Sequence, residues 1–154
     1  MIKINVIQSS VLWKKYLINP QKFIDKKLEL LNKKNKKYAK SILICSLLLS
    51  GPKEIAKLNQ RFRKKNKSTD ILSFPFYEKK KLKRKINLEK EVYLGDIIIN
   101  LNKVKHKDNK SKFKEEFNKL WVHGLVHLFG HMHKKDKDFS IMNKIEKKYL
   151  EYLK

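Results

Sequence analysis

The fold of this chain can be worked out from one short apolar run, Ser41-Ile42-Leu43-Ile44-Cys45-Ser46-Leu47-Leu48-Leu49-Ser50, which Gly51-Pro52 ends. An apolar run of this length, bounded by turn residues, predicts a strand buried in the middle of a sheet. It is well short of the roughly 20 residues that a membrane-spanning helix needs. We therefore place this strand at the centre and assign the rest of the chain around it.

Towards the N-terminus, residues 1–7 alternate between apolar and polar as a half-buried strand does. Asn19-Pro20 then has the form of a helix cap followed by proline at the first helical position. The amphipathic helix that starts there should end between Asn32 and Asn35. These signals predict one strand and one helix before the central strand.

Towards the C-terminus, Gly51-Pro52 begins a second predicted helix, and residues 69–76 and 93–100 are predicted as strands. The charged segment 77–90 between them is expected to be an exposed loop. Helical spacing of apolar residues extends from about Lys112 to Gly130, where glycine suits the end of a helix, and a last helix passes through Phe139 to Leu153. These elements predict an α+β fold, with a small mixed four-stranded sheet packed with helices in a single domain over residues 1–154.

The formal charge is +24, from 39 lysines and arginines against 15 acidic residues. A surplus of this size attracts polyanions, so RNA, DNA and acidic membranes are possible partners. The lysines occur in almost every segment, and a compositional bias of the source genome would explain them as well. The charge alone therefore does not decide the function.

The expected compartment is the cytoplasm. The N-terminus lacks the pattern of a secretory signal, and we expect no transmembrane helix and no membrane partner. The single cysteine, Cys45, cannot form an internal disulfide and is expected to be a buried, unreactive thiol.

Four of the five histidines fall between His123 and His133. His123 and His127 are four residues apart on the predicted helix, so both imidazoles leave one face within reach of one cation. Gly130 then lets the chain leave the helix, and His133 can return as a third ligand. Three protein nitrogens and one open position are typical of catalytic zinc, so we predict one Zn²⁺ per chain. His131 is left open as a substitute ligand, a supporting residue or an exposed side chain, and His106 is expected to be solvated.

The spacing is similar to the metzincin pattern His-Glu-x-x-His-x-x-Gly-x-x-His, but Gly124 stands where those peptidases need a glutamate base. This difference argues against proteolysis. A phosphodiesterase relies more on cationic stabilisation of the phosphoryl charge, so an arginine becomes the residue to look for.

The chain resembles the YbeY family of endoribonucleases in five ordered blocks. They are Leu58-Asn59, Phe62-Arg63, Thr69-Asp70-Ile71-Leu72-Ser73-Phe74-Pro75, Leu94-Gly95-Asp96-Ile97, and His123-Gly124-x-x-His127-Leu128-x-Gly130-x-x-His133. The resemblance extends from about Leu47 to the C-terminus.

This resemblance implies a metal-dependent endoribonuclease specific for single strands, which matures the 3′ end of 16S RNA in the small ribosomal subunit and takes part in ribosome quality control. It implies that His123, His127 and His133 hold the zinc and that Arg63 is the functional arginine. It also suggests the small ribosomal subunit and an assembly GTPase as partners. A guanidinium suits phosphate, because it stays charged and offers a planar fork. Weaker candidates for contacts to the RNA backbone are Arg61, Lys64, Lys65 and Lys67.

The chain departs from the family before the third histidine, where an aromatic residue and an aspartate are usual and this sequence has His131 and Met132. A supporting carboxylate could instead come from Asp136 or Asp138. Ser73 could position substrate or simply be buried, and Asp96 could orient a ligand or be a turn aspartate.

The expected mechanism has zinc activating water or polarising a phosphate oxygen while Arg63 stabilises the charge on phosphorus. The attacking group is either a hydroxide or the 2′-hydroxyl of RNA, and a 2′,3′-cyclic phosphate product would identify the second. The alternative function is a ribosome-assembly factor that binds RNA and in which zinc is only structural.

Overall fold

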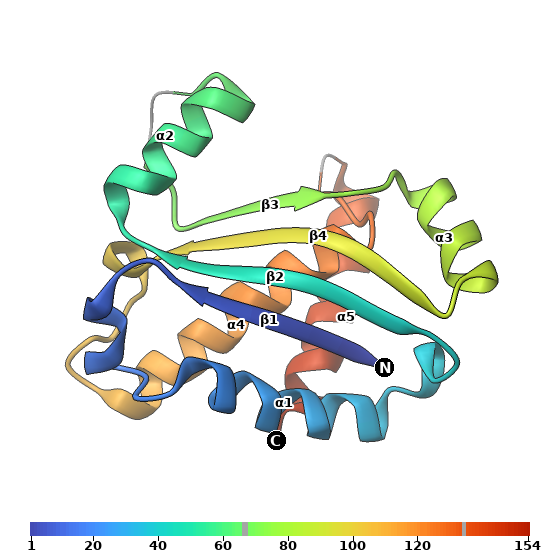
Figure 1. Ribbon diagram of the computed structural model, residues 1–154, viewed down its shortest axis with the longest axis horizontal. Helices are drawn as coiled ribbons and strands as arrows, with labels where there is room; N and C mark the ends of the chain where they lie inside the picture. The colour runs from blue at the N-terminus through green and yellow to red at the C-terminus, as the bar shows by residue number, and fades with distance from the viewer. Residues whose placement is uncertain (66–67, 134) are drawn as a thin grey trace.

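The computed structural model describes residues 1–65, 68–133 and 135–154. These residues form one sheet with helices on both of its faces (Figure 1). The strands are β1 (Ile2–Gln8), β2 (Ile42–Ser50), β3 (Ile71–Pro75) and β4 (Glu91–Asn100). The α-helices are α1 (Pro20–Lys34), α2 (Pro52–Arg63), α3 (Lys79–Leu88), α4 (Lys110–Leu128) and α5 (Asp136–Tyr152), and short 3₁₀ turns span Val11–Lys15, Lys36–Tyr38 and Leu101–Lys103.

The sheet is mixed, with strand order β1-β2-β4-β3. β1, β2 and β4 are parallel, and β3 is an antiparallel edge strand beside β4. The predicted central strand is confirmed, because β2 pairs on both of its sides. The predicted α+β class with a four-stranded mixed sheet is confirmed as well.

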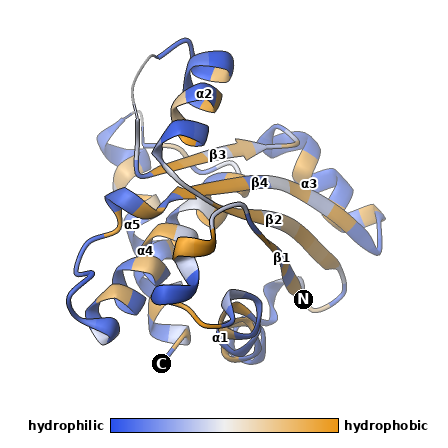
Figure 2. Ribbon diagram, turned by 60° about the vertical axis from the view of Figure 1, so that its left-hand side comes forward, coloured by the Kyte–Doolittle hydropathy of each residue, from blue (hydrophilic) through white to orange (hydrophobic). Residues whose placement is uncertain are grey.

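The two faces of the sheet are covered unequally. Alternate residues of β2, from Leu43 to Leu49, are fully buried towards α1 and α4, whereas those between them are only half-buried. α2 covers part of the second face through Ile55, which packs with Leu72 and Ile98. Figure 2 shows the strands in hydrophobic colours and most outer helical turns in hydrophilic ones. No helix within the described ranges is long and apolar enough to cross a bilayer.

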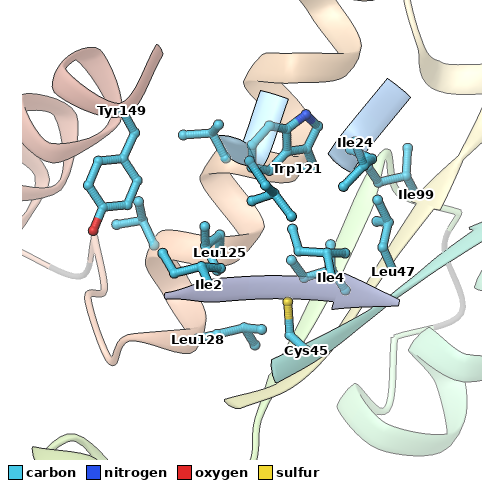
Figure 3. Packing of buried hydrophobic residues seen from close by; sticks show 14 of the residues in the cluster. Ile2, Ile4, Ile24, Cys45, Leu47, Ile99, Trp121, Leu125, Leu128 and Tyr149 are labelled. Atoms are coloured by element: carbon cyan, nitrogen blue, oxygen red, sulfur yellow. The ribbon is translucent and has the colours of Figure 1, made fainter. Parts of the chain in front are cut away.

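The main core lies between the sheet and α1, α4 and α5 (Figure 3). It contains Trp13, Trp121 and the buried side of β1, and Trp13 also donates a hydrogen bond of 3.1 Å from its indole nitrogen to the carbonyl of Ser50. Cys45 belongs to this core, as predicted, and burial raises the pKa of its thiol to about 12. The thiol is therefore protonated at neutral pH, which disfavours nucleophilic reactions.

Local capping signals set the helix ends where the sequence predicts them. The Asn19 side chain accepts a hydrogen bond of 2.9 Å from the Lys22 amide, and Pro20 is the first residue of α1. α1 ends at Lys34, within the predicted interval. Gly130 follows α4 with a φ of +81°, a conformation that glycine adopts without strain.

One prediction is wrong: segment 77–90 is not a loop but contains the helix α3. Leu82 and Ile86 are four residues apart, so they share one face of this helix, and both pack against the main core. Three apolar residues among six cations, with Leu88 exposed, are a weak sequence signal. The core supplies the stabilisation that the sequence pattern does not reveal. The third strand is also shorter than predicted, and the fourth begins two residues earlier, at Glu91.

α4 lies unusually close to the sheet at Gly124. A Cβ atom at this position would lie 2.7 Å from Cγ2 of Ile97 and 3.1 Å from Cδ1 of Ile71. Both isoleucines are branched at Cβ, so they have little rotamer freedom with which to move away. The glycine therefore sets the distance between the helix and the sheet.

We predict that Gly124→Val lowers the free energy of unfolding by about 2 kcal/mol, because the added methyl groups overpack this contact. Thermal unfolding followed by circular dichroism measures the change. Gly51→Ala is the matched control, since nothing lies within 4 Å of a Cβ at Gly51. Equal melting temperatures for Gly124→Val and the wild type would contradict the close approach.

Candidate metal centre

Three histidines converge at the C-terminal end of α4. His123 and His127 lie one turn apart in α4, and His133 lies in the segment between Gly130 and α5. One ring nitrogen from each of them lies within 4.8 Å of the other two. The structure thus brings together the three histidines that the spacing selected.

The outer nitrogens of two of these rings are held by acceptors. Nδ1 of His123 lies 2.8 Å from Oε1 of Glu146, and Nδ1 of His127 lies 2.8 Å from the backbone carbonyl oxygen of His131. A carboxylate and a carbonyl oxygen can only accept, so Nδ1 carries the proton on both rings. Both Nε2 atoms are then lone-pair donors when the rings are neutral.

These two lone pairs point at each other. Nε2 of His123 lies 3.1 Å from Nε2 of His127, and the ring centroids are 4.6 Å apart. Two unprotonated nitrogens this close repel each other unless a cation lies between them. Burial, followed by the charge of His123, lowers the pKa of His127 to about 4, so its ring is neutral and able to bind a metal at pH 7.

The donor set fits a metal of the zinc type. Three imidazole nitrogens are a common catalytic zinc set, and metal-binding histidines usually donate their second N–H to a carboxylate or a backbone carbonyl. Both kinds of acceptor occur here. The residues that would hold the ion are His123, His127 and His133.

His131 lies beside the cluster and contributes its backbone rather than its ring. Its backbone carbonyl accepts from His127, whereas its own ring is not part of the three-histidine cluster. Burial and the nearby charge of Lys79 lower the pKa of the His131 ring. His106, which was expected to be solvated, is exposed.

Glu146 is the residue that sequence reasoning missed. It lies in the middle of α5, 23 residues from the histidine it contacts, and no spacing rule links the two. Asp136 and Asp138, the carboxylates considered instead, lie in the first turn of α5. No contact between either aspartate and the three histidines is found in the described part of the chain.

The cluster opens into a small cavity of about 140 Å³. Phe139, Met142 and Asn143 of α5 line it together with His123, His133 and Glu146. A larger cavity of about 530 Å³ lies between α1, α4 and α5, but no histidine lines it. We assign the chemistry to the smaller cavity, because it holds the metal donors.

Arg63 is the last residue of α2, and its side chain is exposed. α2 packs on the face of the sheet opposite to α4, and no contact joins Arg63 to the histidines among the described residues. Arg61 lies over the ring of Phe62 at 5.4 Å, while Lys64 and Lys65 are exposed. Lys67 lies outside the described residues.

Ser73 and Asp96 lie on different faces of the sheet. Ser73 is two residues from Ile71 in β3 and so faces α4 as Ile71 does. Asp96 lies inside β4 rather than in a turn, and its carboxylate accepts a hydrogen bond of 2.6 Å from the Tyr93 hydroxyl on the opposite face. Asp96 therefore does not orient the histidines.

The model of one protein family, described as Endoribonuclease YbeY, matches residues 11–154. The chain belongs to the YbeY family. It is 41% identical to the YbeY endoribonuclease of Pelagibacter ubique, over 100% of this chain and 97% of that protein. It is 35% identical to the YbeY endoribonuclease of Thermodesulfovibrio yellowstonii, over 84% of this chain and 77% of that one.

The fold is shared with a solved structure. A protein from Thermotoga maritima, determined in solution, superposes with a TM-score of 0.62 at 25% sequence identity. The match covers 98% of this chain and 89% of the other. The family model and the two relatives confirm the YbeY resemblance drawn from the sequence motifs.

We predict that Glu146→Gln weakens zinc binding about 10- to 100-fold, because the amide loses the charge that orients His123 and makes its ring more basic. Competition with a metal chelator gives the dissociation constant. Glu151 is an exposed residue of the same helix, and Glu151→Gln removes the same charge, so this variant should leave the dissociation constant for zinc unaltered. Unchanged zinc affinity in Glu146→Gln would show that the carboxylate does not support the site.

Proposed function

We propose that this chain is a zinc-dependent endoribonuclease that cleaves single-stranded RNA. The observation that carries the proposal is the pair of Nε2 atoms 3.1 Å apart, with both Nδ1 atoms held by acceptors. Membership of a family described as endoribonucleases supports RNA as the substrate. The net charge of +24 is compatible with a polyanionic substrate.

Each residue of the centre has a defined task in this proposal. His123, His127 and His133 hold the ion, which would supply a Lewis acid and a positive charge at the cleaved phosphodiester. Glu146 and the carbonyl of His131 keep the first two rings in the tautomer that presents Nε2. Ordering by these contacts before substrate arrives reduces the reorganisation that catalysis would otherwise require.

Arg63 is proposed to bind the negative charge that develops on phosphorus, which requires the RNA to reach from the histidines past the edge strand β3 to the end of α2. Its guanidinium is exposed and makes no ion pair among the described residues, so it is free to bind phosphate oxygens. A planar guanidinium can donate two parallel hydrogen bonds to phosphate, which lysine cannot do. Arg61, Lys64 and Lys65 at the same end of α2 are proposed as weaker contacts to the RNA backbone.

The cellular role that we propose is maturation of the 3′ end of 16S RNA and quality control of ribosomes in the cytoplasm. The proposed partners are the small ribosomal subunit and an assembly GTPase. The support for this role and for these partners is the family resemblance.

The alternative is an assembly factor that binds RNA without cleaving it and in which zinc is structural. The burial and the number of the histidines disfavour a purely structural zinc. The ring of His133 is exposed and those of His123 and His127 are half-buried, so none of the three is fully buried. A structural site usually has four protein ligands, whereas three histidines come together here.

We predict that wild-type protein cuts a single-stranded ribosomal RNA fragment, and that His127→Ala loses both zinc and cleavage. Arg63→Ala should keep its zinc and lose about 10²-fold or more in kcat, as expected for a group that stabilises transition-state charge. Gel analysis of labelled RNA and metal determination on the same samples measure these effects.

Arg63→Lys is the matched variant, since it keeps the charge and removes the planar fork. Full activity in Arg63→Lys would reduce the role of Arg63 to charge alone. Equal cleavage by wild type, His127→Ala and Arg63→Ala would identify a contaminating nuclease and favour the assembly factor.

We also predict that removing the metal with a chelator abolishes cleavage but leaves the far-ultraviolet circular dichroism spectrum unchanged. The reason is that the buried core is built from apolar residues, whereas the three histidines are half-buried or exposed. Unfolding on chelation would instead support a structural metal.

A further inference from the structure

α3 concentrates positive charge more than any other described helix. Six of its ten residues are cationic: Lys79, Lys80, Lys81, Lys83, Arg84 and Lys85. The other four α-helices each contain at least one acidic residue, whereas α3 contains none. A general bias towards lysine would not by itself produce this contrast.

This arrangement works against the helix itself. Cations in the first turn lie at the positive end of the helix dipole. Three pairs of like charges are four residues apart and repel each other: Lys79 with Lys83, Lys80 with Arg84, and Lys81 with Lys85. Among the described ion pairs, α3 takes part in one, between Lys85 and Glu89. Binding of an anion would relieve this repulsion.

Two aromatic rings, the exposed Phe76 and the half-buried Tyr77, continue the charged surface. The ring of Tyr77 lies beneath the ammonium groups of Lys81 and Lys85, at 5.4 and 5.8 Å. Phe76 is 62% exposed and stands edge-on to Tyr77 at 4.8 Å and to Tyr93 at 5.6 Å. Cations interleaved with exposed rings are typical of surfaces that bind single-stranded nucleic acid, where bases stack and phosphates pair with cations.

The start of α3 touches the segment that carries the third histidine. A Cβ atom at Gly130 would lie 2.7 Å from Cβ of Lys79. A cavity of about 180 Å³ lies between them, lined also by His131, Met132 and Asp138. A nucleic acid lying on α3 would therefore pass next to the metal centre.

We propose that α3 together with Phe76 and Tyr77, here called the α3 surface, binds the single-stranded RNA that flanks the cleaved phosphate. The proposal rests on the proposed function only in placing that phosphate at the histidines. The cations of the α3 surface hold phosphates, and the exposed ring of Phe76 stacks on a base. The occupant is single-stranded because a duplex would keep its bases stacked on each other and unavailable to Phe76.

The test compares two triple variants of equal charge. Lys80→Gln/Lys81→Gln/Arg84→Gln alters exposed residues of α3, and Lys22→Gln/Lys26→Gln/Lys33→Gln alters exposed residues of α1, which packs against β1 at the other edge of the sheet. Binding of a labelled single-stranded RNA is measured by fluorescence anisotropy, with chelator present to prevent cleavage, over a range of salt concentrations.

We expect the α3 variant to bind the single strand about tenfold or more weakly. The slope of the logarithm of its binding constant against the logarithm of the salt concentration should become shallower by about two, since each phosphate contact on a single strand contributes about 0.7 to that slope. The α1 variant should bind nearly as the wild type does. Melting of the α3 variant should be unchanged or slightly higher, because like charges are removed. Equal losses in both triple variants would overturn the proposal.

Phe76→Ala should weaken binding of the single strand about tenfold and leave binding of duplex RNA unchanged. Phe76→Leu keeps an apolar side chain but cannot stack on a base, so it should show the same loss. Equal binding of wild type and Phe76→Ala would remove the aromatic part of the proposal.

Cleavage with metal present separates this inference from the proposed function. If the wild type cuts RNA, the α3 variant should raise KM and leave kcat and zinc content unchanged, and an unaltered KM would refute the α3 surface alone. If no protein cuts RNA but the α3 variant still loses binding, the proposed activity fails and the α3 surface stands.

Discussion

The close contact between Gly124 and the sheet controls the geometry of the whole site. Because no side chain separates α4 from Ile97 and Ile71, the helix lies directly on β3 and β4. With 3.6 residues per turn, His123 and His127 are then turned to one side of α4, where α5 provides Glu146. A glutamate at position 124, which a metzincin peptidase would require, would point at this apolar contact instead of at the metal. The same contact thus shapes the candidate metal centre and disfavours peptide hydrolysis.

The candidate metal centre depends on the acceptors that hold the Nδ1 protons of His123 and His127. A carboxylate from α5 and a backbone carbonyl from the segment after α4 take the Nδ1 protons of two rings. Two lone pairs are thereby forced to face each other, an arrangement that a cation stabilises. The stabilising partners come from two different parts of the chain, so the site forms only when α4, α5 and the segment between them are packed together.

The distribution of charge over the elements is more informative than the net charge. Lysines are spread through almost every segment, which a compositional bias of the source genome would explain as well. α3 differs, because its cations repel each other in a helix that the buried Leu82 and the half-buried Ile86 hold against the core. Its contact with Gly130 joins this charge to the segment that carries His133. Charge that destabilises its own helix is a stronger indication of a polyanionic ligand than charge that acidic neighbours balance.

Features with a local periodicity could be derived from the sequence alone. The apolar run 41–50 predicted the central strand, Asn19-Pro20 predicted the start of α1, and the spacing of His123, His127 and His133 predicted their convergence. Each of these depends on a strand or helix repeat, or on a cap, which neighbouring residues determine. Three features could not be derived in this way: the helix α3, the pairing of Glu146 with His123, and the position of Arg63 across the sheet from α4. They depend on how elements distant in sequence pack onto one core, because Leu82 is buried and Glu146 reaches a histidine only when the sheet, α4 and α5 are assembled.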